Sequence, residues 1–168
     1  MGSAPRVRYR GRIVNMGTLG YSQDGAYLEA SHARQDALDA SLQYGTPVSV
    51  IFRGESDVSR DTLGTIKKRN ASPLLNMNAF PVERQPDTRK LEKAGIRETV
   101  DVVIYTPIQA WIDSGRVTDE RIGDTFASID TTRSTVVLDG SEWKIADKGL
   151  AVRIGQYPVY ITLGLRRN

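Results

Sequence analysis

The sequence predicts a mainly β protein with short helices, in the α+β class. The expected architecture is a small antiparallel β-barrel or sandwich with an N-terminal helix and long arms. Asp139-Gly140 stands between two apolar-rich segments, which is a strong signal for a two-residue hairpin turn. Strand-like apolar segments recur at 47–54, 98–106 and 157–165. Short strands joined by turns are typical of small barrels and sandwiches.

The N-terminal part of the sequence predicts an arm followed by one helix. Residues 1–27 are rich in Gly and Arg, so we expect an arm with a short strand around Ile13. Residues 31–44 predict a helix, because Ser31 can cap it, Ala is frequent, and Gly45 can end it.

The next segments predict a strand and a long loop. Residues 47–54, PVSVIFRG, are expected to form the strand. Residues 55–79 show no long periodic run and contain Gly64, Pro73 and a charge cluster, which predicts a loop or arm. A structureless loop of that length in a compact domain usually serves a function or a partner.

The middle of the chain predicts a helix, a strand and a helical turn. Asp87 can cap a short helix that carries Leu91, and Gly95 can end it. Residues 98–106, ETVDVVIYT, place apolar side chains on both faces and predict a mostly buried strand. Pro107 is suited to the first position of a short helical turn. The turn would carry three apolar residues on one side, namely Ile108, Trp111 and Ile112.

The Asp139-Gly140 turn fixes a register for the hairpin. It pairs Leu138 with Ser141, Val137 with Glu142, Val136 with Trp143, and Thr135 with Lys144. Because side chains alternate along a strand, one face is expected to be buried and the other wet. The buried face would carry Val136, Leu138, Trp143 and Ile145. The polar segment 116–133, which precedes the hairpin, predicts a loop with extended pieces. The last predicted strand, at 157–165, would place Val159, Ile161, Leu163 and Leu165 on one face.

A length of 168 residues predicts one domain overall. Within it, residues 1–75 are expected to form an N-terminal arm, helix and long loop that pack on or extend from the core. Residues 76–168 are expected to form the compact antiparallel β core. The chain has no Cys, no apolar run near 18 residues and no apolar N-terminal segment, so we expect no disulfide, membrane span or secretory signal.

Residues for catalysis are few. His32 is the single histidine, no G-x-S-x-G motif accompanies it, and its place near the predicted helix start indicates a surface residue. Two carboxylate groups lack the spacing of a known metal loop, and arginines lie among them, which favours ordinary solvated charge. They are Glu55, Asp57 and Asp61, and Asp113, Asp119, Glu120 and Asp124. We therefore expect no enzyme, and no catalytic, cofactor-binding or metal-binding residue.

Basic residues gather at two places in a chain whose net charge is only +3. They are Arg6, Arg8, Arg10 and Arg12 in the arm, and Lys67, Lys68 and Arg69 in the predicted loop. One interpretation is solvated tails, because charge runs are commonly exposed. The other is contact with a phosphate backbone or an acidic protein surface. These seven residues are the candidates for contact with a partner or DNA.

Two segments resemble the head–tail connector proteins of tailed phages, which are the small neck proteins called head-closure, stopper or adaptor proteins. The first segment is MNAFPVERQPDTRKLEKAGIRETVDVVIYTPIQAWID, in which KLEKAGIRE precedes a buried strand ending in YTP and a tryptophan turn. The second is TTRSTVVLDGSEWKIADKGLAVRIGQYPVYITLGLRR, with VVLDG, an ADKG turn and a tyrosine-bearing last strand. Together they lie within residues 76–168.

The resemblance implies a structural virion protein without enzymatic activity. It implies a ring of six or twelve copies at the head–tail junction, with a portal or adaptor protein on the head side and a tail protein on the other. Packaged DNA would pass through the channel, no membrane would be involved, and assembly would take place in the host cytoplasm. The arginine-rich arm would then meet a partner subunit or the DNA exit path.

Three alternatives remain open. A tail terminator or another tail ring protein would have similar features. A nucleic-acid-binding β-barrel would use the basic arm and a sheet face, and its binding would weaken steeply with salt. An enzyme with an acidic metal site would be stabilised by added magnesium, calcium or manganese.

Overall fold

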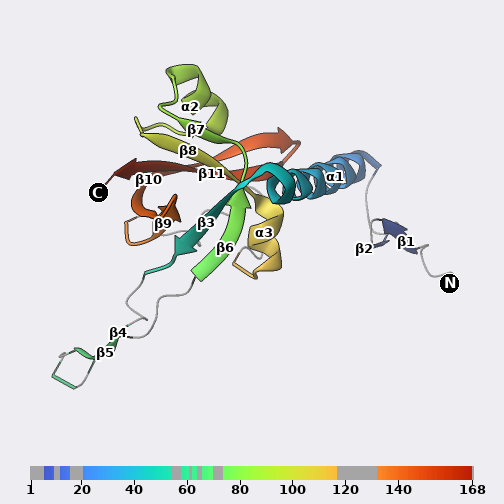
Figure 1. Cartoon of the computed structure of the whole chain (residues 1–168). Coiled ribbons are helices and arrows are strands. Elements are labelled where there is room, and N and C mark those ends of the chain that lie inside the picture. Colours follow the sequence, from blue (N-terminus) through green and yellow to red (C-terminus); the bar gives the residue numbers. More distant parts are fainter. Residues whose placement is uncertain are drawn as a thin grey trace.

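One antiparallel sheet forms the body of the protein. The computed structural model describes residues 6–9, 12–15, 21–53, 58–60, 62–63, 66–69, 74–116 and 132–167. The sheet contains β3 (Thr46–Ile51), β6 (Leu74–Ala79), β7 (Val82–Arg84), β8 (Val102–Pro107), β9 (Thr135–Leu138), β10 (Ser141–Ile154) and β11 (Tyr157–Arg167). Its seven strands lie in the order β6-β3-β9-β10-β11-β8-β7, and neighbours are antiparallel (Figure 1). The predicted fold class, mainly β with helices, is confirmed.

The two outer strands of this sheet follow one another in the chain. β6 pairs with β3, β7 pairs with β8, and only Phe80 and Pro81 separate β6 from β7. The Phe80 amide donates to the Tyr105 carbonyl at 2.9 Å, and the Tyr105 amide donates to the Pro81 carbonyl at 3.1 Å. One extended segment therefore connects both edges of the sheet and curves it into a barrel-like core.

The inner face of the curved sheet holds the main hydrophobic core. Trp111 and Trp143 both lie in it, with 0% and 7% of their surface exposed, which confirms their predicted packing role. They are joined there by apolar residues of β3, β6, β8, β9, β10 and β11, including Val50, Ile104, Val136, Leu138, Ile161 and Leu163. A second cluster forms on the outer face, beside α2 (Thr88–Ala94), from Ala94, Ile96, Val100, Val103, Tyr105 and Ala151.

The predicted hairpin is confirmed in its register. β9 and β10 pair Leu138 with Ser141, Val137 with Glu142, Val136 with Trp143, and Thr135 with Lys144. Asp139 and Gly140 have φ of +51° and +73°, as a primed two-residue turn requires. Val136, Leu138, Trp143 and Ile145 are buried as expected. On the face expected to be wet, Glu142 and Lys144 are exposed, but Thr135 is buried and Val137 is half-buried, because β3 pairs with β9 on its other side.

Gly140→Val is expected to lower the free energy of unfolding by about 1–3 kcal/mol, because a β-branched residue is strained at positive φ. No atom lies within 4 Å of a Cβ built at this position, so the penalty comes from the backbone and not from a clash. Urea unfolding measures the loss. Gly140→Asn is the matched control, since Asn tolerates this conformation better, and equal losses for the two variants would contradict the explanation.

The turn expected at ADKG is not observed, because this sequence belongs to the long β10–β11 hairpin. The ADKG sequence, residues 146–149, lies inside β10 and is not a turn; the register shifts there, between Ile145 and Asp147. The chain reverses instead at Gly155 and Gln156. The predicted last strand is confirmed, with Val159, Ile161, Leu163 and Leu165 all buried on one face.

The N-terminal helix is longer than predicted. α1 spans Tyr21–Tyr44, so it includes residues 21–27, which were expected to belong to the arm. Its N-terminal half packs against the end of the β10–β11 hairpin, where the rings of Tyr27 and Tyr157 stack edge to face at 5.3 Å. This tertiary contact supports a segment whose own apolar pattern is weak. Ser31 and His32 consequently lie inside the helix, and His32 is half-buried and not a surface residue at a helix start.

The segment expected to be a long loop contains strands. Within residues 55–79 lie β4 (Val58–Arg60), β5 (Ile66–Arg69) and the sheet strand β6. Leu75 and Ala79 of β6 are buried while Leu74 and Asn76 are exposed, so the strand has the usual alternation. Two asparagines give β6 low intrinsic strand propensity, and its pairing with β3 compensates for this. The strand predicted at 47–54 is observed as β3, which begins at Thr46 and ends earlier than expected, at Ile51; Gly54 lies outside the described residues.

The elements between β7 and α3 follow the prediction closely. The Asp87 side chain accepts from the Lys90 amide at 2.9 Å, and Gly95 ends α2 with φ of +71°. β8 begins at Val102, later than the predicted residue 98. Pro107 is the last residue of β8 and the N-cap of α3 (Ile108–Asp113), one position before its predicted role. Ile108, Trp111 and Ile112 pack on the core as expected.

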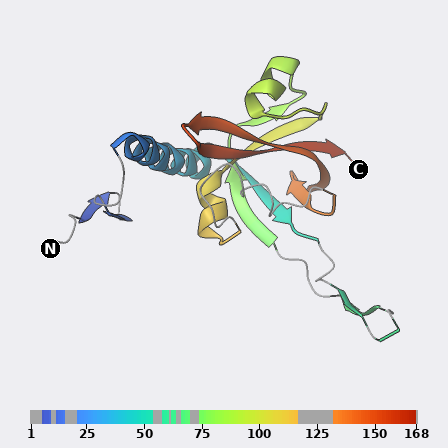
Figure 2. The same cartoon turned by 180° about the vertical axis from the view of Figure 1, so that it is seen from behind.

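Two small hairpins lie apart from the sheet. β1 (Arg6–Tyr9) pairs with β2 (Arg12–Asn15), which contains the predicted strand around Ile13, and β4 pairs with β5. Each is a separate two-stranded sheet. β1–β2 lies beyond the N-terminal end of α1, and β4–β5 lies beyond the ends of β3 and β6, in both views (Figures 1 and 2). The seven-stranded sheet takes β3 and the first residues of β6 from the 1–75 segment, so that segment contributes to the core.

Candidate assembly surfaces

The predicted contact residues lie on the two separate hairpins. Arg6 and Arg8 are on β1, Arg12 is on β2, and Lys67, Lys68 and Arg69 are on β5. Arg10 lies outside the described residues. The hairpins stand at different places on the molecule (Figures 1 and 2), so the structure does not bring the two basic groups together. Each hairpin is therefore a separate candidate surface.

An isolated two-stranded hairpin is at best marginally stable in water. β1–β2 has four-residue strands, and the strands of β4–β5 have three and four residues. Neither hairpin is part of the central sheet. Burial against another surface would supply the stability that such short pairs lack.

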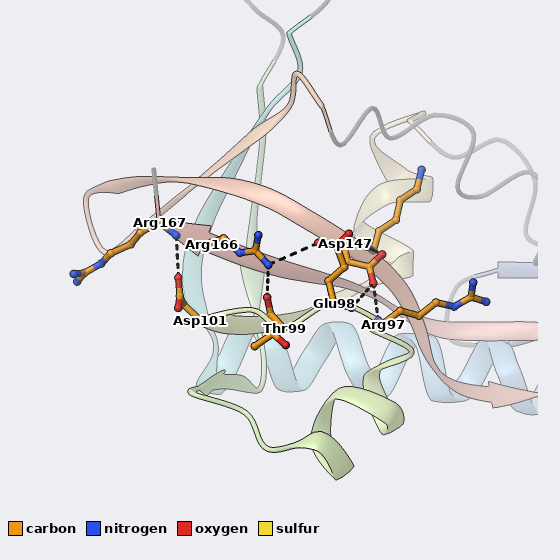
Figure 3. A network of polar contacts seen from close by, with 8 residues as sticks. Arg97, Glu98, Thr99, Asp101, Asp147, Arg166 and Arg167 are labelled. Carbon is orange, nitrogen blue, oxygen red and sulfur yellow. Dashed lines mark hydrogen bonds and ion pairs between the residues drawn. The ribbon is translucent and has the colours of Figure 1, made fainter.

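A polar network holds the loop before β8 against the middle of β10 and the end of β11 (Figure 3). Asp147, at the β10 register shift, accepts from the amides of Arg97 at 2.6 Å and Glu98 at 3.3 Å, and its other oxygen accepts from the Lys148 amide. Arg166 donates to the Thr99 carbonyl at 2.5 Å, and the Arg167 amide donates to Asp101 at 3.0 Å. The network explains why residues 98–101 are fixed although they are not part of the strand.

Charges in this network largely cancel. Arg166 forms an ion pair with Glu98 at 3.8 Å, and Arg97 and Arg167 belong to the same network as Asp147 and Asp101, to which their backbone amides donate (Figure 3). A surface that binds phosphates needs an excess of positive charge. The network therefore fits a structural clamp better than a nucleic-acid-binding surface.

Asp147→Ala is expected to destabilise the protein by about 1–2 kcal/mol, comparable to the loss of a helix cap, because three backbone amides lose their acceptor. Thermal unfolding measures the change, and hydrogen exchange at the Arg97 and Glu98 amides should become faster. Glu92→Ala, on the exposed surface of α2, is the control and should change stability by less than about 0.5 kcal/mol. Unchanged exchange at both amides would show that the clamp is not formed by Asp147.

The helix α1 presents an acidic surface that the sequence analysis did not single out. Glu29, Asp36 and Asp39 are exposed, and their spacings of seven and three residues place them on one side of the helix. The buried residues Ala30, Arg34, Ala37 and Ser41 form the opposite side. The spacing of the acids is visible in the sequence, but only the extent of α1 shows that they share one continuous helix.

Groups for acid–base or metal chemistry are dispersed among the described residues. No group of three or more His, Cys, Asp or Glu side chains that could hold a metal lies in the described part of the chain. Of the two carboxylate groups, only Asp113 lies there, at the end of α3. Burial raises the pKa of Tyr105 above its ordinary value, and the Glu83 carboxylate raises it further. Burial also raises the pKa of Tyr160, whose ring stacks edge to face on Tyr105. Both phenols therefore stay neutral near pH 7 and serve in packing.

Comparison with protein-family models, with curated proteins and with solved structures finds no match to this chain. Within the described ranges, no helix has the length and apolar character needed to cross a membrane.

Proposed function

We propose that this protein is a structural component of the neck of a tailed bacteriophage. Copies of the chain form an oligomeric ring that joins the DNA-filled head to the tail, between a portal or adaptor protein and a tail protein. The observation that carries the proposal is the presence of two hairpins outside a closed, well-packed core. Each hairpin is too small to be stable alone, and a ring supplies neighbouring subunits that cover it.

The core supports this role because it gives the hairpins a rigid base. β3 and β6, which lead to and from β4–β5, pair with each other along their whole length. α1, which follows β1–β2, is tied to the β10–β11 hairpin by Tyr27 and by the buried Arg34, which donates to the Pro158 carbonyl at 2.8 Å. Projecting elements on rigid supports are suited to contacts between stacked or neighbouring subunits. The resemblance of residues 76–168 to phage connector proteins points to the same function.

The test uses the particles produced by cells that carry this gene. Disruption of the gene is expected to leave filled heads and tails unjoined, and a plasmid copy should restore joined particles. Immunogold labelling of intact particles should place the protein at the head–tail junction. Label on the tail alone would indicate that the protein is a tail terminator or another tail ring protein and not a neck protein. Absence of label on both intact and disrupted particles, together with normal joining after disruption of the gene, would refute the proposal.

A nucleic-acid-binding barrel is the second candidate, because all predicted basic residues with a described position lie on the hairpins. It predicts that the purified chain binds duplex DNA with an affinity that falls steeply as salt increases, in proportion to the phosphates contacted. The neck proposal predicts weak binding by the free subunit. Filter binding at two salt concentrations distinguishes the two candidates.

A further inference from the structure

The two end strands of the seven-stranded sheet differ in how their outer edges are protected. β7 has three residues, two of them charged, and the residue after it, Gln85, leaves the extended conformation with φ of +49°. β6 has six residues, LLNMNA, without a charge or a proline. Natural sheets usually protect an edge strand by keeping it short or by placing charges or proline on it. β7 is therefore protected against pairing, whereas β6 is suited to accept another strand.

The β9–β10 turn determines which backbone groups of β6 point outward. In a two-residue hairpin the residues that flank the turn bond to each other, so Leu138 directs its backbone groups to β10 and Val137 directs its own to β3. Val137 pairs with Ser49 of β3. The next residue along, Val48, therefore directs its groups to β6, where it pairs with Met77. Odd-numbered residues of β6 thus bond to β3, and even-numbered residues point away from it.

The even-numbered residues of β6 are Leu74, Asn76 and Asn78, and we call their backbone N–H and C=O groups the β6 outer edge. The Phe80 amide, which follows in the same alternation, donates to the Tyr105 carbonyl of β8, in agreement with this direction. Among the described residues, none donates to or accepts from the β6 outer edge. Each of its three residues therefore presents one backbone donor and one acceptor.

We infer that the β6 outer edges of two copies pair with each other, antiparallel and about a two-fold axis. Each N–H of one edge then faces a C=O of the other, so the partial charges are complementary. The other strands with an unpaired side in the described chain are β1, β2, β4, β5 and β7. They have three or four residues, and each contains a charged residue. The best match in length and charge for the β6 outer edge is therefore a second copy of itself.

The faces of β6 determine the register of this pair. Leu75 is buried whereas Leu74 and Asn76 are exposed, and opposite residues of antiparallel strands lie on the same face. The register that uses the whole edge places Asn76 opposite Asn76 of the second copy, and Leu74 opposite Asn78. Leu75 then lies opposite Met77 on the inner face, so apolar side chains continue across the contact. A shift of one residue would place buried residues against exposed ones.

The inference goes beyond the proposed function. A closed ring repeats one heterologous contact, whereas a two-fold pair closes on itself. The pair is therefore the form of the free chain, and it separates before a ring assembles through other surfaces. Pairing covers an uncharged edge that would otherwise be open to aggregation.

Residue 76 provides the test in the full chain, because the two-fold axis places it opposite its own copy. The wild-type chain is expected to have twice its 18.6 kDa mass by sedimentation equilibrium. N76K and N76D each place like charges opposite each other and are expected to be monomers. An equimolar mixture of the two pairs unlike charges and should regain the doubled mass. N76A is the matched control, because it also loses the hydrogen bond from Ser49 to Asn76 but adds no charge, and it should remain a dimer.

A disulfide gives a second measurement if a charged variant folds poorly. The chain has no cysteine, so each introduced thiol is unique. Opposite residues of a hydrogen-bonded antiparallel pair have Cα atoms about 5.5 Å apart, which a disulfide can bridge. N76C should therefore form a linked dimer on oxidation. L74C is the control, since the register separates the two copies of position 74 by about 13 Å along the strands, and it should link only when mixed with N78C.

Four outcomes would overturn the inference. They are a wild-type chain that stays monomeric at its highest soluble concentration, an N76K chain with the wild-type mass, monomers in the N76K and N76D mixture, and equal self-linking of N76C and L74C. None of them decides the proposed function, which the particle labelling and gene disruption test separately. Conversely, the expected dimer together with no protein on particles would support the pairing and refute the neck function.

Discussion

Trp111→Ala is expected to lower the free energy of unfolding by about 3–5 kcal/mol, which would remove much of the stability of a domain of this size. Trp111 is completely buried, and its ring stacks edge to face on Phe52 at 6.0 Å. Removing it leaves a cavity between α3 and the inner face of the sheet. Urea unfolding followed by circular dichroism measures the loss.

A hydrogen-bonded chain accounts for part of this effect. Trp111 Nε1 donates to Thr106 Oγ1 at 2.9 Å, and Thr106 Oγ1 donates to the Ile161 carbonyl at 2.6 Å. Trp111→Phe keeps an aromatic ring but removes the first donor, so we expect a smaller loss of about 1–2 kcal/mol. Leu74→Ala, at an exposed position, should cost less than about 1 kcal/mol. A loss below about 1 kcal/mol for Trp111→Ala would show that α3 does not pack as described.

Gly149→Ala is expected to destabilise the protein by about 3 kcal/mol, at the upper end of the usual range for overpacking. A Cβ at this position would overlap the Ala94 carbonyl oxygen and lie 2.8 Å from the carbonyl carbon of Gly95. These are backbone atoms at the end of α2, so no side chain can rotate away to relieve the clash. Thr162 Oγ1, which donates to the same Ala94 carbonyl at 2.5 Å, would lie 2.7 Å from the new carbon.

Gly25→Ala is the matched control, because it adds the same methyl group with no atom within 4 Å. Gly25 lies in α1, where Ala is the better helix former, so this variant is expected to gain about 0.5–1 kcal/mol. Thermal unfolding of both variants gives shifts of opposite sign. A stable Gly149→Ala protein would contradict the close approach of α2 to β10.

Local signals in the sequence predicted the elements that local chemistry controls. Asp139 and Gly140 suit a turn with positive φ, and the observed register follows from them residue by residue. Asp87 and Gly95 bound α2 for the same reason, since a side-chain cap and a left-handed residue act within one turn of the helix. The predicted contact residues with a described position occupy the hairpins β1–β2 and β4–β5, and their role in binding stays a prediction.

Elements that depend on distant contacts were missed. The first turns of α1 have no strong apolar stripe and pack on residues near Tyr157, far along the chain. β6 contains two asparagines and was expected to be a loop, yet pairing with β3 makes it a sheet strand. The ADKG segment has turn-like residues, but β11 pairs with it along one side. In each case the tertiary partner outweighs a weak local preference.

The sequence by itself therefore determined the fold class, the β9–β10 hairpin with its register, the limits of α2 and the buried face of the last strand. These features follow from residues that are close together in the chain. Only the tertiary structure decided that one segment through Phe80 and Pro81 joins both edges of the sheet, and that Asp147 holds the loop before β8. It also decided that Glu29, Asp36 and Asp39 share one exposed helix face. Such features depend on burial and hydrogen bonding between segments far apart in sequence, which no local pattern specifies.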